Sequence, residues 1–221
     1  MGDTSTAAAS IASPVKRAMD ITAAVLLLLV LSPLLVMVAL LIKARMGGPV
    51  LFRQPRPGYG ERPFGMIKFR TMREPRPNEV RELSDGNRLT PLGRFLRKSS
   101  IDELPELLNV LRGEMSLVGP RPLLMQYLPF FTDRERLRFA ARPGITGWAQ
   151  VRGRNEMPWD ERLEADAYYV EHWSLWLDLR ILALTFRAVF SGGGIVVDAR
   201  QRMPNLDEAR ALPSAIPSSH H

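Results

Sequence analysis

The feature that most constrains this chain is an apolar run over residues 21–42, which contains no charged residue. As a straight helix at 1.5 Å per residue it would be about 33 Å long, enough to cross the core of a bilayer. Its midpoint, however, is Ser32-Pro33. Pro33 has no amide hydrogen to donate to the Leu29 carbonyl, so a helix must bend here, and the Ser32 hydroxyl can partly satisfy the freed carbonyl. The segment therefore either crosses the membrane with a kink or enters it and returns.

Basic residues flank the run at both ends, with Lys16 and Arg17 before it and Lys43 and Arg45 after it. Positively charged flanks stay on the cytoplasmic side of a membrane, so both ends favour the same side. Each half of the run would be only about 14 to 17 Å long as a helix, roughly half of the hydrocarbon thickness. The pattern thus predicts a helix-break-helix over residues 14–46 that enters one leaflet. A kinked spanning helix is the alternative, because prolines are common in such helices.

Composition excludes several classes of chemistry. The chain has no cysteine, which rules out disulfides, thiolate zinc sites and cysteine nucleophiles, and His172 is the only histidine before the final two residues. A Ser-His-Asp hydrolase or a histidine-rich metal site is therefore not expected, and a metal would be a hard ion held by oxygens. The net charge of +7 calls for an anionic partner, which could be nucleic acid, acidic lipid or a phosphorylated substrate.

Residues 47–202 are predicted to form one catalytic unit on the cytoplasmic side. It begins with two extended runs, 50–53 and 66–71, joined by a loop rich in Pro, Gly and Arg. The glycines of this loop do not make a dinucleotide-binding fingerprint. Farther along, Thr90 and Pro91 are typical of a helix start.

The two ends of the chain differ from this unit in composition. Residues 1–13 and the Pro-, Ser- and Ala-rich residues 203–221 are predicted to be disordered.

The stretch SSIDELPELLNVLRGEMSLVGPRPLL is the centre of the functional argument. Its leucines recur at helical spacing, Pro105 is tolerated only in a first turn, and Gly113 ends the pattern, so Asp102 and Glu103 lie at a helix start. Ser100 and Glu103 could simply form a capping box. The acids are, however, flanked by basic residues, namely Arg94, Arg97, Lys98 and Arg121. A helix start among arginines favours phosphate binding, and carboxylates there could hold Mg²⁺ or attack phosphorus.

Four motifs in this order make the chain recognisable: KRAMDITAAVLLLLVLSPLLVMVALLIKAR, FRQPRPGYGERPFGMIKFRTM, the stretch quoted above, and RPGITGWAQVRGRN. Together they resemble the bacterial sugar transferases known as monotopic polyprenol-phosphate phosphoglycosyl transferases. The resemblance covers residues 16 to 193 and is to the small, minimal-core members, since 221 residues leave no room for the additional membrane helices and domain of larger members.

The resemblance implies a mainly α fold with a small β element, and a re-entrant membrane helix broken at Ser32-Pro33. It places the protein in the bacterial inner membrane as a monotopic protein, with the catalytic domain facing the cytoplasm. The implied reaction transfers a sugar phosphate from a UDP-sugar to undecaprenyl phosphate, giving a polyprenyl-diphosphate sugar and UMP. It also implies Asp102 as the nucleophile and Mg²⁺ as the cofactor, and we expect Glu103 to bind the metal or to position the acceptor phosphate, with a general base as a further possibility.

Further residues are candidates for substrate binding. Arg97 and Arg121 are the strongest phosphate ligands, followed by Lys68 and Arg56, although any single arginine could be a solvated surface charge. The remaining candidates are Pro120 and Pro122, whose turn could contain a cis bond and present Arg121 to the nucleotide, and Gln150, Arg152 and Asn155, which could equally belong to a structural turn and strand.

Residues 174–190 form an amphipathic run that, with Trp148, Trp173 and Trp176, suits a helix at the membrane surface, although a core helix is the rival interpretation.

Two other functional classes are alternatives to a transferase. A membrane-tethered nucleic-acid binder lacks a binding motif, so nucleic acid is not an expected partner. A scaffold without catalysis would leave the Asp102-Glu103 pair unexplained. The sequence leaves open the sugar, the oligomeric state (monomer or homodimer) and the pathway served, whether glycoprotein, capsule, exopolysaccharide or O-antigen assembly.

Overall fold

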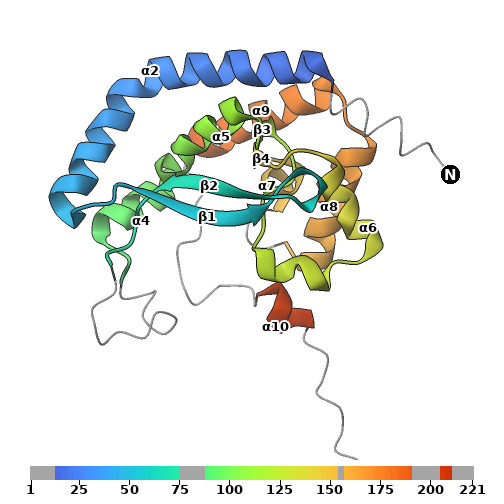
Figure 1. The fold of residues 1–221 in the computed structure, drawn as a ribbon. Coiled ribbons are helices and arrows are strands. Elements are labelled where there is room, and N and C mark those ends of the chain that lie inside the picture. The colour runs from blue at the N-terminus through green and yellow to red at the C-terminus, as the bar shows by residue number, and fades with distance from the viewer. Residues whose placement is uncertain (1–12, 75–87, 154–156, 191–204, 211–221) are drawn as a thin grey trace, which may run out of the picture.

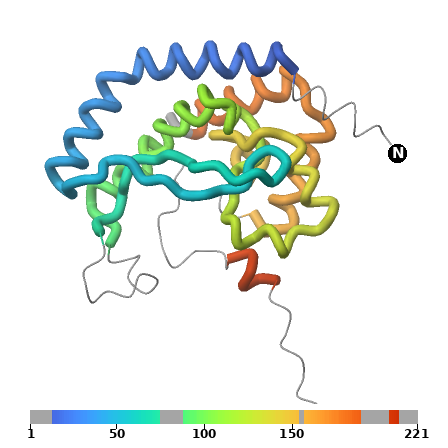
Figure 2. Tube along the Cα trace, in the orientation of Figure 1, coloured from blue at the N-terminus to red at the C-terminus, as the bar shows by residue number. Residues whose placement is uncertain are grey.

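The structure is a computed structural model that describes residues 13–74, 88–153, 157–190 and 205–210. A long N-terminal helix, α2 (Pro14–Met46), arches over a domain of short helices and a β-hairpin (Figures 1 and 2). The hairpin crosses the front of this domain and the helices α8 and α9 lie behind and beside it. The predicted fold class, mainly α with a small β element and an N-terminal membrane helix, is confirmed.

Helix α2 bends within its length, as Figure 1 shows. The helix contains Pro33, and the Ser32 hydroxyl donates a hydrogen bond to the Leu29 carbonyl at 2.8 Å. This is the carbonyl that would otherwise accept from the missing amide of Pro33. The Ser32 hydroxyl thus supplies the predicted local compensation, but α2 is one continuous helix that bends, and not two helices separated by a break.

Both halves of α2 pack on the same domain. In the first half Ala24 is fully buried against Leu107 and Val110, and in the second half Ile42 is fully buried in a cluster with Phe69. The rest of the helix surface is exposed and apolar, including Val25, Leu26, Leu29, Val30, Val36, Met37 and Leu40. Among the described residues α2 is the one helix long and apolar enough to cross a membrane, and only 11% of its most hydrophobic window is buried. This surface is that of a membrane-anchoring helix.

The hairpin pairs β1 (Leu51–Pro57) with β2 (Pro63–Phe69) in antiparallel register, from Leu51 opposite Phe69 to Pro57 opposite Pro63. A short turn, η1 (Tyr59–Glu61), joins them. The two predicted extended runs are thus confirmed, with β2 beginning earlier than expected. Met66 and Ile67 of β2 are buried, and Met66 packs in the cluster of Ala24, Leu107 and Val110.

Helix α4 (Pro91–Lys98) begins as predicted, because the Thr90 side chain accepts from the Gly93 amide at 2.9 Å. The following segment differs from the prediction of a single helix. It consists of a 3₁₀ helix, η2 (Ile101–Glu106), followed by α5 (Leu107–Arg112), which ends at Gly113 with φ 83°. Pro105 explains the division, since it has no amide hydrogen for the ladder of a regular α-helix.

A second sheet pairs β3 (Ser116–Val118) with β4 (Gly144–Thr146) in parallel. Around it lie η3 (Met125–Phe130), α6 (Asp133–Arg136), η4 (Leu137–Ala140), α7 (Trp148–Gly153), α8 (Trp159–Glu171) and α9 (Leu175–Phe190). Gly119, directly after β3, passes so close to the loop before β4 that an added Cβ would lie 2.3 Å from the Arg142 carbonyl oxygen. Only glycine therefore allows this close approach of the two chain segments.

The predicted disordered tail is wrong for residues 206–210, which form α10 (Leu206–Arg210). Leu206 is fully buried in a cluster with Tyr127 and Leu163, and Arg210 forms an ion pair with Glu135 at 2.7 Å. The composition of this segment suggested disorder, but docking against the domain supplies the stabilising burial. Residues 1–12 and 211–221, also predicted to be disordered, lie outside the described residues.

Helix α9 buries Ile181 and exposes an apolar stripe that includes Trp176 and Phe186. Trp148 and Trp173 pack partly buried against the core cluster of Ile181. Of the three tryptophans expected at a membrane surface, Trp176 is therefore the exposed one.

Candidate active site

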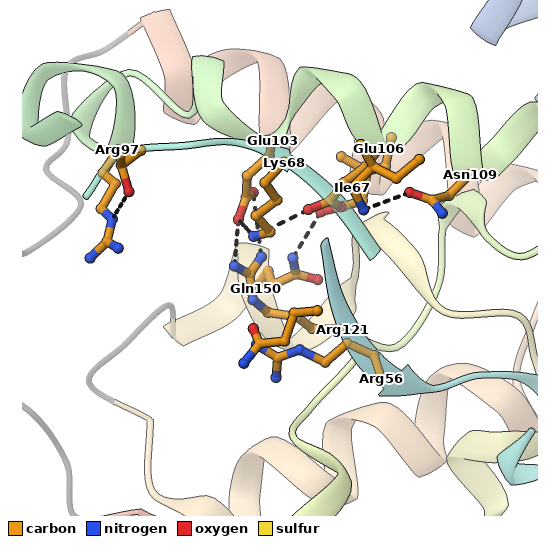
Figure 3. Close-up of polar contacts among 12 residues, drawn as sticks. Arg56, Ile67, Lys68, Arg97, Glu103, Glu106, Asn109, Arg121 and Gln150 are labelled. Atoms are coloured by element: carbon orange, nitrogen blue, oxygen red, sulfur yellow. Dashed lines mark hydrogen bonds and ion pairs between the residues drawn. The ribbon is translucent and has the colours of Figure 1, made fainter. Parts of the chain in front are cut away.

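The candidate site is built where η2 lies against β2. Asn109, fully buried near the start of α5, fixes this contact. Its Oδ1 accepts from the Ile67 amide at 3.0 Å (Figure 3), and its Nδ2 donates to the Gly65 carbonyl at 2.9 Å. These bonds occupy backbone groups of β2 and set the height of η2 over the strand. They bring Lys68 beneath the acidic side chains of η2.

Glu103 pairs with two cations. Its Oε1 lies 2.6 Å from Lys68 Nζ and 2.6 Å from Arg121 Nη2 (Figure 3). Burial acts to raise the pKa of Glu103, but Arg121 and Lys68 outweigh it and hold the pKa at about 2. The capping-box interpretation is wrong, because Ser100 has φ 57° and its side chain makes no cap hydrogen bond.

Asp102 has the opposite electrostatic character. Its side chain is only 8% exposed, and burial, followed by the charge of Glu103, raises its pKa to about 6, against the attraction of Lys68, Arg97 and Arg121. At neutral pH it is ionised and yet poorly solvated. A carboxylate in this state is suited to nucleophilic attack and to binding a hard cation.

Glu106 is a third acid that sequence reasoning missed. It is 2% exposed, and its Oε1 lies 3.1 Å from Lys68 Nζ. Burial raises its pKa to about 7, with Glu103 adding to the effect and Lys68 opposing it. The spacing of Glu103 and Glu106 by three residues places both on one face of a 3₁₀ turn, and this was the available signal.

Arginines gather on the other side of Glu103. Arg56 donates to Gln54 Oε1 at 2.7 Å, and burial and then the charge of Arg121 lower its pKa to about 10. The pKa of Arg162 on α8 is also lowered, by burial and then by Arg121. Positive charges that oppose each other in this way make a site for an anion. Arg162 has no motif around it that would mark it in the sequence.

Arg97 reaches the site from α4. Its Nε donates to Thr71 Oγ1 at 3.0 Å, and its charge acts to lower the pKa of Asp102. Thr71 is 6% exposed and was not selected from the sequence. It fixes one edge of the Arg97 guanidinium, a group whose planar shape suits the binding of phosphate.

The Gly-Pro-Arg-Pro segment shapes a crevice beside Arg121. It is lined by Pro57, Gly58, Pro120, Arg121, Pro122, Leu123, Arg138, Phe139, Ala141 and Pro143. Arg138 Nη2 donates to the Arg121 carbonyl oxygen at 2.5 Å and pairs with Asp166 at 2.9 Å, so the turn is held from beneath. The suggestion of a cis bond in this segment is wrong, since Gly48-Pro49 is the one cis peptide in the described part of the chain.

The candidates from the fourth motif are placed differently. Gln150 Nε2 donates to the Ile145 carbonyl at 3.0 Å, and its Oε1 is buried without a hydrogen bond to any described residue. The Arg152 guanidinium lies 5.4 Å from the centre of the Trp148 ring, a contact outside the acidic cluster. Asn155 lies outside the described residues.

The carboxylate oxygens of η2 make only part of the ligand set that a metal ion needs. Glu103 is already neutralised by Lys68 and Arg121, and no group of three or more acidic or histidine ligands occurs within the described ranges. Glu106 also pairs with Lys68, so Asp102 is the one acid of η2 that makes no ion pair with a described residue. One protein carboxylate with water and substrate oxygens is a ligand set that Mg²⁺ accepts, so the residues fit a magnesium ion shared with substrate, with Asp102 as its protein ligand.

Comparison with known proteins decides the family. The model of the family described as "Bacterial sugar transferase" matches residues 11–192. The chain belongs to the bacterial sugar transferase family. As a sugar transferase it is an enzyme, and the family match covers every element of the site described above.

Three similar sugar transferases illustrate the range of the family. The uncharacterized sugar transferase EpsL of Bacillus subtilis is 50% identical over 81% of this chain and 89% of its own length. The UDP-glucose:undecaprenyl-phosphate glucose-1-phosphate transferase of Caulobacter vibrioides is 47% identical over 77% of this chain and 67% of its own. The undecaprenyl-phosphate glucose phosphotransferase of Komagataeibacter xylinus is 47% identical over 80% of this chain, but the match spans only 36% of that larger protein.

Proposed function

We propose that this sugar transferase moves a sugar 1-phosphate from a UDP-sugar to undecaprenyl phosphate, through a covalent phosphosugar intermediate on Asp102. The observation that carries the proposal is the state of Asp102, a buried carboxylate whose pKa is raised to about 6 while Lys68, Arg97 and Arg121 surround it with positive charge. Relatives that are named for glucose 1-phosphate transfer to undecaprenyl phosphate support the substrate classes.

The chemistry balances without an added acid or base. A carboxylate oxygen of Asp102 attacks the phosphorus that carries the sugar, and the bond from that phosphorus to the UMP oxygen breaks, with UMP keeping the electron pair. An oxygen of undecaprenyl phosphate then attacks the same phosphorus and releases the Asp102 carboxylate. The acyl phosphate is a reactive mixed anhydride, so the second transfer is feasible.

The cations of the site stabilise the charge that moves in each step. Arg121 and Lys68 are held on Glu103, so they stand pre-aligned next to the diphosphate, and Arg97 is aligned by Thr71. Preorganised charges of this kind lower the barrier because they need no reorganisation during the reaction. Mg²⁺, which we propose as the cofactor with Asp102 as its protein ligand, would supply further charge neutralisation on the phosphate oxygens.

We further propose that the enzyme is monotopic in the bacterial inner membrane, with the domain on the cytoplasmic face. Both halves of α2 are buried against the same domain. At its start Lys16 pairs with Asp178, and at its end Arg70 Nη2 donates to the Met46 carbonyl oxygen at 2.6 Å. A helix held to one domain at both ends returns to its own side of the bilayer, and the bend in α2, which contains Pro33, makes the return possible.

The experiment that tests the reaction uses the protein in nanodiscs with undecaprenyl phosphate, Mg²⁺ and a panel of UDP-sugars, and follows UMP release. We expect UMP with at least one sugar and a loss of about 10³-fold or more in Asp102→Asn. Asp133→Asn, on an exposed acid at the start of α6, is the matched control and retains activity. Turnover that survives in Asp102→Asn would contradict the covalent mechanism, and silence across the panel would contradict the substrate class.

The membrane topology is tested with cysteine labelling, for which the cysteine-free chain is a clean background. Single cysteines at Ser13 and Gly47, which flank α2, should both react from the cytoplasmic side with a membrane-impermeant maleimide. Labelling from opposite sides would show a spanning helix.

A further inference from the structure

Glu106 is the buried acid that the proposed chemistry does not use. It lies on η2, four residues after Asp102. Only 2% of it is exposed, so a substrate in solution does not contact it directly. Its Oε1 is 3.1 Å from Lys68 Nζ, and Lys68 also pairs with Glu103. A buried carboxylate that shares its cation with a second carboxylate is only partly neutralised, so its burial calls for an explanation.

Glu106 and Glu103 compete for the same cation, Lys68. The same ammonium group lies 2.6 Å from Glu103 Oε1, so two carboxylates share one lysine. Lys68 belongs to β2 and Glu103 to η2 itself, while Arg56 from β1 and Arg121 from the segment after β3 are the other charges that act on Glu106. Glu103 also takes up Arg121. The charge on Glu106 therefore decides how much positive charge is left for a phosphate.

We propose that Glu106 sets the donor affinity of this site: it competes with the diphosphate of the UDP-sugar for Lys68, so the site binds the donor tightly when Glu106 is neutral and weakly when it is ionised. This inference rests on the proposed function, because it takes the donor to be a nucleotide diphosphate sugar. Glu106 is a positioning residue in this account, since it acts through Lys68 and does not touch the reacting atoms.

The direction of the effect follows from charge. With Glu106 protonated, Lys68 and Arg121 share one ion-paired carboxylate, that of Glu103, and the two cations keep net positive charge for the donor. With Glu106 ionised, a second anion neutralises Lys68 and repels the diphosphate. The pKa of Glu106, about 7, places this change in the physiological range. The diphosphate of a UDP-sugar is fully ionised across this range, so the donor itself does not titrate.

The test measures binding and needs no turnover. The Asp102→Asn protein in nanodiscs is titrated with UDP-glucose at several values between about pH 6 and about pH 8.5, and the same is done after adding Glu106→Gln. The Asp102→Asn background blocks the reaction and also removes the other acid of the site that titrates near neutrality. Glu161→Gln, on an exposed acid of α8, is the matched control.

We expect the Kd for UDP-glucose to rise about tenfold with pH when Glu106 is present and in the Glu161→Gln control. With Glu106→Gln the Kd should stay at its low-pH value throughout, because the amide keeps the shape and cannot ionise. A rise that persists in Glu106→Gln, or a flat profile with Glu106 present, overturns the inference and leaves the proposed function intact. If neither UDP-glucose nor any other UDP-sugar binds at any pH, the proposed function fails and the inference fails with it.

Discussion

Two buried groups of charges in this enzyme are built in opposite ways. Where α2 meets α9, Asp178 is 5% exposed and its oxygens accept from three donors: Lys16 Nζ at 2.5 Å, Tyr169 OH at 2.8 Å and Trp173 Nε1 at 3.2 Å. In the candidate active site, by contrast, Glu106 Oε1 and Arg56 Nε are buried without a hydrogen bond to the described residues.

The difference separates a group that holds the fold from one that serves chemistry. A fully partnered buried acid gains nothing from a ligand, whereas partly satisfied charges are stabilised when a substrate of the right charge arrives. The pKa of Asp102, raised to about 6 chiefly by burial, is a sign of the second kind. Partly satisfied charges at the active site lower the stability of the fold and raise the reactivity of the site. Variants of the Asp178 group and of the active site should therefore change stability in opposite directions.

The largest expected loss of stability is at Asp178, the fully partnered acid. Lys16→Met leaves Asp178 buried without its cation, and removing one partner of a buried ion pair costs about 3 to 5 kcal/mol. We expect a correspondingly large fall in the thermal midpoint of the detergent-held protein. The double variant with Asp178→Asn should recover most of the loss, since the amide oxygen can still accept a hydrogen bond. An unchanged midpoint in Lys16→Met would show that the pair is dispensable.

Asp102→Asn should act in the opposite direction and stabilise the protein. The pKa of Asp102 is about 6 in the folded state and 3.8 as the ordinary value, so folding favours the protonated form. Stability is then lost as the pH rises from about 4 to about 6, and above that range the ionised group costs about 2 to 3 kcal/mol. At pH 8 the variant should unfold at a higher temperature than the wild type, and near pH 3.5 the difference should vanish. A variant that is less stable at pH 8 would contradict the proposed strain.

Thr71→Val tests the alignment of Arg97 within the site. Valine keeps the shape of threonine but cannot accept the hydrogen bond from Arg97 Nε, which measures 3.0 Å. We expect KM for the UDP-sugar to rise about three- to tenfold, or about 0.7 to 1.4 kcal/mol, with little change in the thermal midpoint. Thr71→Ser restores the acceptor and should restore KM. Equal KM values in the valine and serine variants would show that the Thr71 hydroxyl does not align Arg97 for the UDP-sugar.

The smallest effect is expected for charges that are paired but exposed. Arg134 pairs with Glu164 and Glu171 on the surface of α6 and α8, and its side chain is 45% exposed. Arg134→Gln should change the free energy of unfolding by less than about 1 kcal/mol, because solvent screens such pairs. High salt should reduce even this difference in a denaturant titration. A loss as large as that of Lys16→Met would show that pairing, and not burial, sets the cost.

The parts of the fold that follow from neighbouring residues were predictable. The bend at Ser32-Pro33, the Thr90 helix cap and the two strands of the hairpin each depend on chemistry within a few positions of the chain. The same holds for Arg97, which precedes Asp102 closely in the sequence, but the contact of Arg121 with Glu103 joins positions 18 residues apart and depends on packing. The division of the helix around Pro105 was missed, although the proline marked the place.

Long-range packing accounts for what could not be predicted. Helix α10 is ordered because Leu206 fits beside Tyr127 and Leu163, which lie far from it in the chain. The sequence also could not show that Arg152 stands over Trp148 and not beside the acids. A side chain's partners are known only when the elements that carry them are packed.

The sequence by itself thus determined the bend of the membrane helix, the hairpin and the acidic pair in a basic setting, because local geometry and charge order are properties of short segments. Only the tertiary structure decided the environment, and with it the pKa, of each acid. Asp102 and Glu103 are adjacent and chemically alike, yet Lys68 and Arg121 meet Glu103 and burial isolates Asp102. Desolvation and long-range ion pairs act on each carboxylate separately, so two neighbouring acids acquire pKa values of about 6 and about 2 and with them different tasks.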